Sequence, residues 1–336
     1  PVNYTDIILK IIRSTSPLVF LLFLLISIAL WYPAFHSPEM IPFSFDEVKM
    51  PLYELFYNWL SQHQFLRIFI PFLLLLIQAV FILKINREYI LVEKQNYLPT
   101  LIFIIIASSF IELQRINPGI FANLFIILML DQVFASYKKR YVLNKLFMAG
   151  FFVGIASLFY SFAIIYLIII WISLFLLRSI NLREWFVPIL GVIFPFLFLF
   201  AIYYIHDGLT IMGLNETIKA NITAPVSITH YQTPYYIFYA ILGLFVIFGS
   251  FSIIKKFPGR KIYIRKFFEI LWWMFVAPVL MLIFMNQIYG EIIYFIAIPI
   301  TFLIADYVNS IKNRTLGNTM FLFLLASLAY VWVIHI

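Results

Sequence analysis

Long apolar runs, separated by short polar or basic clusters, make up most of the chain. A helix needs about 20 mostly apolar residues to cross a bilayer. The pattern therefore predicts eleven spans, at residues 17–35, 66–83, 97–112, 119–136, 145–160, 162–177, 185–205, 235–254, 268–286, 291–308 and 319–335. The apolar cores of the third and fourth spans are shorter than a normal crossing, which leaves open a short hairpin that neighbouring helices shield from lipid.

The loop between the first two predicted spans contains an amphipathic helix. Following Pro51, five apolar residues recur at helical spacing: Leu52, Leu55, Phe56, Trp59 and Leu60. Since a helix of this kind has one apolar face and one polar face, it is expected to lie along the membrane surface.

Polar and small residues are rare inside the predicted spans. Gln78 and Ser27 are the more deeply placed polar residues, and we expect both to form hydrogen bonds between helices. Ala149, Gly150 and Gly154 form a face of small residues at the start of the fifth span, which predicts close helix packing.

Composition agrees with this pattern. Of 336 residues, 64% are hydrophobic and 11% are charged, against roughly 45–50% and about 25% in soluble domains. The apolar runs are too long and too continuous for the alternating strands of an outer-membrane barrel. The absence of cysteine excludes disulfides and thiolate chemistry. The sequence thus predicts an all-α, polytopic transmembrane bundle forming a single domain over residues 1–336.

The net charge of +8 is explained by orientation in the membrane. With a cytoplasmic N-terminus, every Lys and Arg except Lys49, Arg67, Arg115 and Lys219 falls on the inner side, as the positive-inside rule requires. Eleven spans then place the C-terminus outside. We expect a multi-pass protein of the bacterial inner membrane, with lipids rather than nucleic acid as its partners.

The first outer loop holds the leading candidates for catalysis. Asp46 and Glu47 precede the amphipathic helix, where a carboxylate could deprotonate an acceptor hydroxyl as it attacks a lipid-linked sugar. The alternative is that these carboxylates only stabilise the nearby helix N-terminus.

Two further outer loops supply candidate binding residues. Glu112 could hold a divalent cation together with the first-loop carboxylates, and Arg115 could contact a phosphate; an ordinary ion pair is the competing interpretation. The loop at 206–234 carries His206, His230 and Tyr231, which suit the hydroxyls and faces of sugars, although tyrosines also populate interfacial belts.

This layout resembles the C-type (GT-C) superfamily of integral-membrane glycosyltransferases over about residues 1–254, with residues 255–336 as additional C-terminal spans. The stretch Ala149-Gly150-x-x-x-Gly154-x-Ala156 is similar to one common in the fifth span of that group. The resemblance implies that Asp46 is the base, that Glu47 can replace it, and that Glu112 holds a metal (Mg²⁺ or Mn²⁺) or a phosphate. Neither loop contains Asp-x-Asp. The chain is also similar to uncharacterised bacterial inner-membrane proteins.

The sequence leaves three functions open. The first is transfer of a sugar from a polyprenyl-phosphate carrier to a lipid, glycan or protein at the outer face of the inner membrane. The second is a non-catalytic subunit that scaffolds an envelope, secretion or motility complex together with other inner-membrane subunits. The third is a flippase or polymerase of envelope glycans.

Overall fold

The computed structural model describes residues 18–36, 50–60, 62–92, 97–179, 181–206, 219, 233–284 and 290–311, together with residues 323, 325, 326 and 328. All regular structure within these residues is helical. The α-helices are α2 (Leu18–His36), α3 (Pro51–Leu60), α4 (Gln64–Tyr89), α5 (Leu98–Ala107), α6 (Pro118–Ala135), α7 (Leu143–Phe159), α8 (Tyr166–Leu177), α9 (Leu182–His206), α11 (Thr233–Lys256), α12 (Ile262–Phe284) and α13 (Ile292–Ser310). Short 3₁₀ helices are η2 (Ile111–Leu113), η3 (Ser161–Ile165) and η4 (Phe257–Gly259).

Each of the first ten predicted spans coincides with a helix, so the all-helical prediction is confirmed for the described residues. Five helical stretches are long and apolar enough to cross a membrane: Gln64–Tyr89, Pro118–Ala135, Leu182–Ile202, Tyr236–Gly259 and Ile292–Ser310. Four apolar stretches are shorter: Leu21–His36, Leu98–Ala107, Leu143–Phe159 and Ser161–Leu177. The chain therefore has the character of a membrane protein. The last predicted span, 319–335, lies almost entirely outside the described residues.

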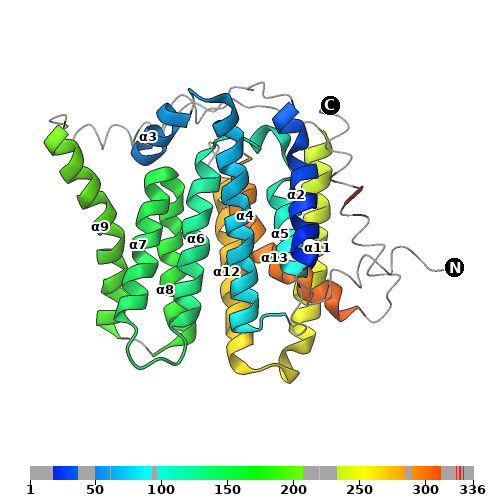
Figure 1. The fold of residues 1–336 in the computed structure, drawn as a ribbon. Coiled ribbons are helices and arrows are strands. Elements are labelled where there is room, and N and C mark those ends of the chain that lie inside the picture. The colour runs from blue at the N-terminus through cyan, green and yellow to red at the C-terminus, as the bar shows by residue number, and fades with distance from the viewer. Residues whose placement is uncertain are drawn as a thin grey trace.

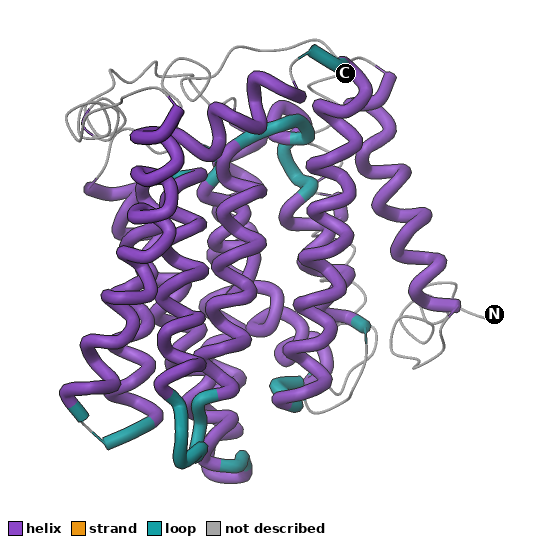
Figure 2. Tube along the Cα trace, turned by 60° about the vertical axis from the view of Figure 1, so that its left-hand side comes forward, coloured by secondary structure: helices purple, strands orange, loops and turns teal. Residues whose placement is uncertain are grey.

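Apart from α3, which lies obliquely at one end, successive α-helices run in alternate directions, which gathers the connecting segments at two ends (Figure 1). We call the end where α2 finishes and α4 begins the upper end, at the top of Figure 1. The opposite end, where α4 finishes, is the lower end. Figure 2 shows the same separation after a 60° turn, with the long helices roughly parallel between the two ends.

The core of the bundle is formed around α5 and α13. All ten residues of α5 are buried, and α13 is almost completely enclosed by α5, α6, α11 and α12. At 1.5 Å per residue, α5 is about 15 Å long, half of a bilayer core. Of the two possibilities that the sequence left open, α5 fits a short helix shielded by its neighbours, whereas α6, with 18 residues, is long enough to cross.

The closest helix packing joins α7 and α9. A Cβ on Gly150 would lie 2.1 Å from the carbonyl oxygen of Pro188, and one on Gly154 would lie 2.6 Å from that of Val192. Gly191 of α9 is equally tight against Phe147. Backbones can approach this closely only where side chains are absent, so the predicted packing role of the small residues is confirmed.

Candidate functional site

The segment between α5 and α6, residues 108–117, forms a buried polar cluster at the upper end. The chain leaves α5 at Ser108 and Ser109, passes through η2, and re-enters a helix at Pro118. Asn117 caps α6, because its side-chain oxygen accepts the backbone N–H of Ile120 at 2.9 Å. Proline at the first helical position lacks the N–H that would otherwise need a partner. Asn117-Pro118 therefore fixes where this segment ends.

Hydrogen bonds connect this segment to α2. The indole N–H of Trp31 donates to the Ser108 hydroxyl at 3.0 Å. The amide of Gln114 donates to the carbonyl oxygens of Leu30 (3.1 Å) and Ser108 (2.9 Å). These groups are buried, where a polar group left without a partner would be costly. The segment is thus held rigidly against the last turns of α2.

Asn117 and Tyr294 connect the same segment to α13. The Asn117 amide donates to the carbonyl oxygens of Leu113 and Arg115, both at 2.9 Å, and to the Tyr294 hydroxyl at 3.3 Å. Tyr294 in turn donates to the Leu113 carbonyl at 3.0 Å. A backbone bond from Ile116 to the carbonyl of Arg67 (2.9 Å) adds α4. Helices α2, α4 and α13 therefore position one short segment.

Three charged residues accompany this cluster. Arg115 and Glu291 are buried, while Glu112 is half-buried. Glu291 immediately precedes α13 and lies against the start of α6, since a Cβ on Gly119 would be 2.7 Å from that of Glu291. A guanidinium can contact a phosphate, and a carboxylate can hold a cation that accompanies it.

Helix α3 lies obliquely beside this cluster at the upper end (Figure 1). The Tyr53 hydroxyl donates to the Ile116 carbonyl at 3.4 Å, and the Phe56 ring packs on Phe121 and Phe159 at 5.5 and 5.6 Å. Leu55 and Trp59 remain exposed. The predicted amphipathic helix is therefore present, with an apolar surface that the described residues do not cover.

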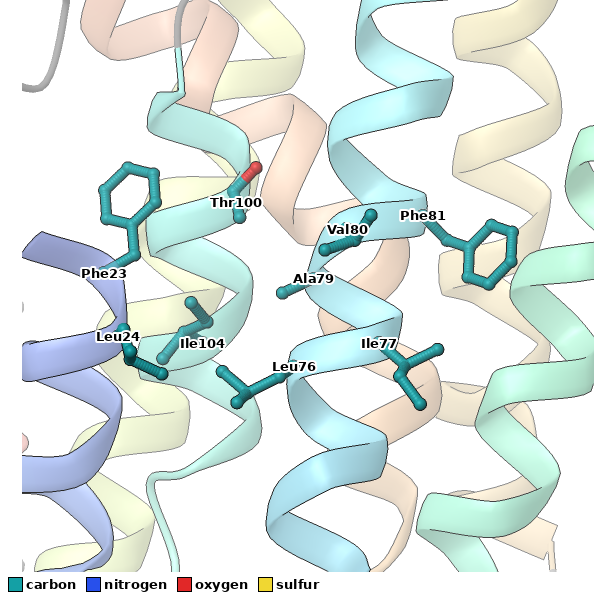
Figure 3. Close-up of a pocket in the computed structure, with 9 residues that line it drawn as sticks. All are labelled: Phe23, Leu24, Leu76, Ile77, Ala79, Val80, Phe81, Thr100 and Ile104. Carbon is teal, nitrogen blue, oxygen red and sulfur yellow. The ribbon is translucent and has the colours of Figure 1, made fainter. Parts of the chain in front are cut away.

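An apolar hollow of about 270 Å³ opens between α2, α4 and α5 (Figure 3). Its walls include Phe23, Leu76 and Ile104, and the Thr100 hydroxyl is the polar group among the side chains shown. Ile104 stands one helical turn before Ser108, so the hollow begins about 6 Å below the polar cluster. The apolar hollow and the polar cluster therefore follow one another along the axis of α5.

The structure describes only part of the predicted site. Glu112 and Arg115 both lie in the segment at 108–117. Asp46, Glu47, His230 and Tyr231 lie outside the described residues, as does the side chain of His206, the last residue of α9. Among the described residues no group of three His, Asp or Glu could hold a metal ion.

Sequence reasoning missed several members of the polar cluster. Tyr53, Gln114, Asn117, Glu291 and Tyr294 were not singled out as contributors. Only Asn117 carried a usable signal, because Asn followed by Pro and Gly is typical of a helix start. The pairing of Asn117 with Tyr294 spans 177 positions and depends on tertiary packing.

Charged residues at the lower end form ion pairs that connect helices. Lys84 contacts Asp131 at 2.8 Å, which joins α4 to α6. Asp306 of α13 pairs with Lys256 at 3.1 Å and with Arg260, joining α13 to the α11–α12 turn. These acidic residues lie near the ends of α6 and α13, and each has a cation as its partner.

Comparison with known proteins gives a family and no activity. The sequence profile of a family of unknown function (DUF6427) matches residues 48–336. No curated protein and no solved structure matches the chain.

Proposed function

Because the chain belongs to this family of unknown function (DUF6427), we propose an activity from its own residues: transfer of a sugar from a polyprenyl-phosphate carrier to a lipid, glycan or protein. The observation that carries the proposal is the arrangement at the upper end. A surface helix with exposed Leu55 and Trp59 contacts a rigid segment that bears Glu112 and Arg115. A lipid head group at the membrane surface could contact both the surface helix and the segment with Glu112 and Arg115.

The proposed orientation places the upper end outside the bacterial inner membrane. All described Lys and Arg except Arg67, Arg115 and Lys219 lie toward the lower end, and basic residues remain on the cytoplasmic side. In this proposal the chain crosses eleven times, with its N-terminus inside and its C-terminus outside. The carrier would then be approached from the outer leaflet.

The proposed chemistry begins with Asp46 as general base, with Glu47 able to replace it. The carboxylate takes the proton of an acceptor hydroxyl, whose oxygen attacks the anomeric carbon of the sugar. The bond from that carbon to the phosphate oxygen breaks, and the polyprenyl phosphate leaves. Arg115 would contact the phosphate, and His206, His230 and Tyr231 would contact the sugar.

A divalent cation fits this proposal only if first-loop residues contribute. Carboxylate oxygens are suitable ligands for Mg²⁺ and Mn²⁺. The described residues bring no set of three ligands together, so Glu112 would need Asp46 or Glu47 to complete a site. The cation would neutralise phosphate charge.

The hollow between α2, α4 and α5 favours the proposal that the substrate is carried by a lipid. It is almost entirely apolar and begins one helical turn below the segment with Glu112 and Arg115. An isoprenoid tail could occupy it while the phosphate remains at the upper end.

Carboxylate-to-amide variants test the proposal. Purified protein in proteoliposomes would be supplied with a panel of radiolabelled polyprenyl-phosphate hexoses and N-acetylhexosamines. Asp46→Asn should lower transfer about 100-fold or more. Glu54→Gln is the matched control, since Glu54 is an exposed carboxylate on α3, and should transfer normally. Normal transfer by the Asp46→Asn, Glu47→Gln double variant, or no transfer by wild type from any donor, would contradict the proposal.

The alternative, a non-catalytic subunit of an envelope, secretion or motility complex, is favoured by one observation. The upper half of α9 diverges from α7 in Figure 1 and exposes Leu197, Phe198 and Ile202. A partner subunit could cover that face. Native purification that recovers a stoichiometric membrane partner, together with absent transfer, would support this alternative; a monomer with transfer activity would exclude it.

A further inference from the structure

A second hollow, of about 360 Å³, lies between α8 and α9 toward the lower end. Five apolar side chains line it: Trp171, Leu182, Trp185, Phe186 and Ile189. Leu182 and Phe186 are 72% and 62% exposed, so the hollow opens on the outside of the bundle. It belongs neither to the polar cluster nor to the proposed route of the carrier.

Two tryptophans form a fixed wall of this hollow. The indole N–H of Trp171 donates to the carbonyl of Trp185 at 3.1 Å, and the two rings are nearly parallel, with centroids 6.4 Å apart. The Trp171 N–H is already used and the lining of the hollow is almost entirely apolar, so this wall presents mainly carbon to an occupant. A hydrocarbon chain suits such a wall, and tryptophan is favoured at the depth where lipid chains meet their head groups.

Arg178 brings a basic loop to the same place. Its guanidinium forms a two-bond contact with Glu184, at 2.7 and 3.1 Å, and also donates to the carbonyls of Ser136 (3.1 Å) and Lys139 (2.8 Å). Glu184 directly precedes Trp185. The loop with Lys138, Lys139 and Arg140 is therefore held against the turn where the hollow begins.

The charge beside the hollow is strongly positive. Arg178 and Glu184 neutralise each other, whereas Lys138, Lys139, Arg140 and Arg183 are exposed. None of these four forms an ion pair with a described residue. Arg183 adjoins Leu182 in the chain, so cationic groups lie directly next to the apolar wall.

We propose that this hollow and the adjoining cations form a binding site for one anionic phospholipid. An acyl chain would lie between Trp185 and Phe186, and the head-group phosphate would contact Lys139 and Arg183. Basic pockets between helices on the cytoplasmic side are suited to such head groups. The inference requires that α8 and α9 lie in a bilayer, but it does not require sugar transfer.

Brominated lipids test the site, because bromine quenches tryptophan fluorescence on contact. The full chain would be reconstituted in phosphatidylcholine vesicles containing dibrominated phosphatidylglycerol or dibrominated phosphatidylcholine. The difference in quenching between wild type and the Trp171→Phe, Trp185→Phe variant measures the brominated lipid bound at the site. In wild type, this difference should show binding of phosphatidylglycerol about tenfold tighter than binding of phosphatidylcholine, since each nearby cation adds a several-fold attraction.

Charge variants show whether the preference belongs to this site. Lys139→Gln with Arg183→Gln should reduce the preference to about twofold or less. Lys255→Gln with Lys261→Gln removes two exposed cations near the α11–α12 turn and should leave the preference unchanged. No preference in wild type, an unchanged preference in the first variant, or an equal loss in both variants would overturn the proposal.

Discussion

Asp306 shows how a single carboxylate can hold α13 against the α11–α12 turn. It accepts from Lys256 and Arg260, and the side chains of Arg260 and Asp306 are only 3% and 2% exposed. Removing one member of a buried ion pair leaves the other charge enclosed without compensation, which costs about 3–5 kcal/mol. We therefore expect Asp306→Asn to lower the free energy of unfolding by that amount, measured by denaturant titration in detergent micelles.

Glu88→Gln is the control for this prediction. Glu88 and Lys84 are 3.9 Å apart on one face of α4, with side chains 51% and 48% exposed. Exposed pairs of this spacing contribute about 0.3–0.5 kcal/mol. Similar losses for both variants would mean that Asp306 is not the buried anchor inferred from the structure.

Of the two polar residues expected to form hydrogen bonds between helices, Gln78 does so and Ser27 does not. Gln78 does bridge helices, donating to the Ile120 carbonyl (2.7 Å) and accepting from Asn123 (2.8 Å). Ser27 does not: its hydroxyl donates to Phe23 of its own helix at 2.7 Å. A serine hydroxyl can reach the carbonyl four residues earlier, whereas the longer glutamine side chain extends to a neighbouring helix.

At the scale of elements, Gly150 controls how closely α7 and α9 approach. A methyl group there would overlap the Pro188 backbone, which cannot move aside as a flexible side chain could. Overpacking of this kind costs about 1–3 kcal/mol. We expect Gly150→Ala to destabilise the bundle by that amount and to lower its melting temperature in detergent.

Gly243 in α11 provides the matched comparison. A Cβ at Gly243 meets nothing within 4 Å, so Gly243→Ala adds a methyl group without a clash. Alanine also favours helix over glycine by up to about 1 kcal/mol. An unchanged or raised melting temperature is expected for Gly243→Ala. A Gly150→Ala variant as stable as this one would show that α7 and α9 are less tightly packed than the structure has them.

Apolar length was sufficient to locate the helices, but not their exact ends or their buried faces. Helix α4 continues to Tyr89, beyond the predicted end at 83, because Lys84 finds Asp131 and Tyr89 bonds to the same carboxylate at 3.1 Å. Hydropathy cannot reveal such partners. Helices such as α2 are apolar on all sides, so the sequence does not indicate which face packs inward.

At the scale of the whole molecule, the lack of cysteine makes orientation directly measurable. Single cysteines at Tyr141, an 85% exposed residue toward the lower end, and at Glu54 of α3 would report the two ends separately. In spheroplasts, a membrane-impermeant maleimide should label Glu54→Cys and should reach Tyr141→Cys only after permeabilisation. The reverse pattern would invert the proposed orientation, and labelling of both in intact spheroplasts would contradict a bundle that separates the two ends.

The assembly of the upper end could be predicted only in outline. The sequence placed Glu112 and Arg115 in one outer turn, and the structure describes that turn as the segment at 108–117. It could not anticipate that Asn117 and Tyr294 would fasten that segment to α13, because such contacts arise from packing between distant parts of the chain. The hypothesis about Asp46 and Glu47 stays a prediction.

The central claim is that the upper end holds the phosphate of a polyprenyl carrier. A cryo-electron microscopy map of the protein in nanodiscs saturated with polyprenyl phosphate tests it most directly. The account predicts head-group density beside α3, within contact of Arg115 and Glu112, and a tail entering the hollow between α2, α4 and α5. Density for the head group only at the lower end, or none at the upper end under saturating lipid, would contradict it.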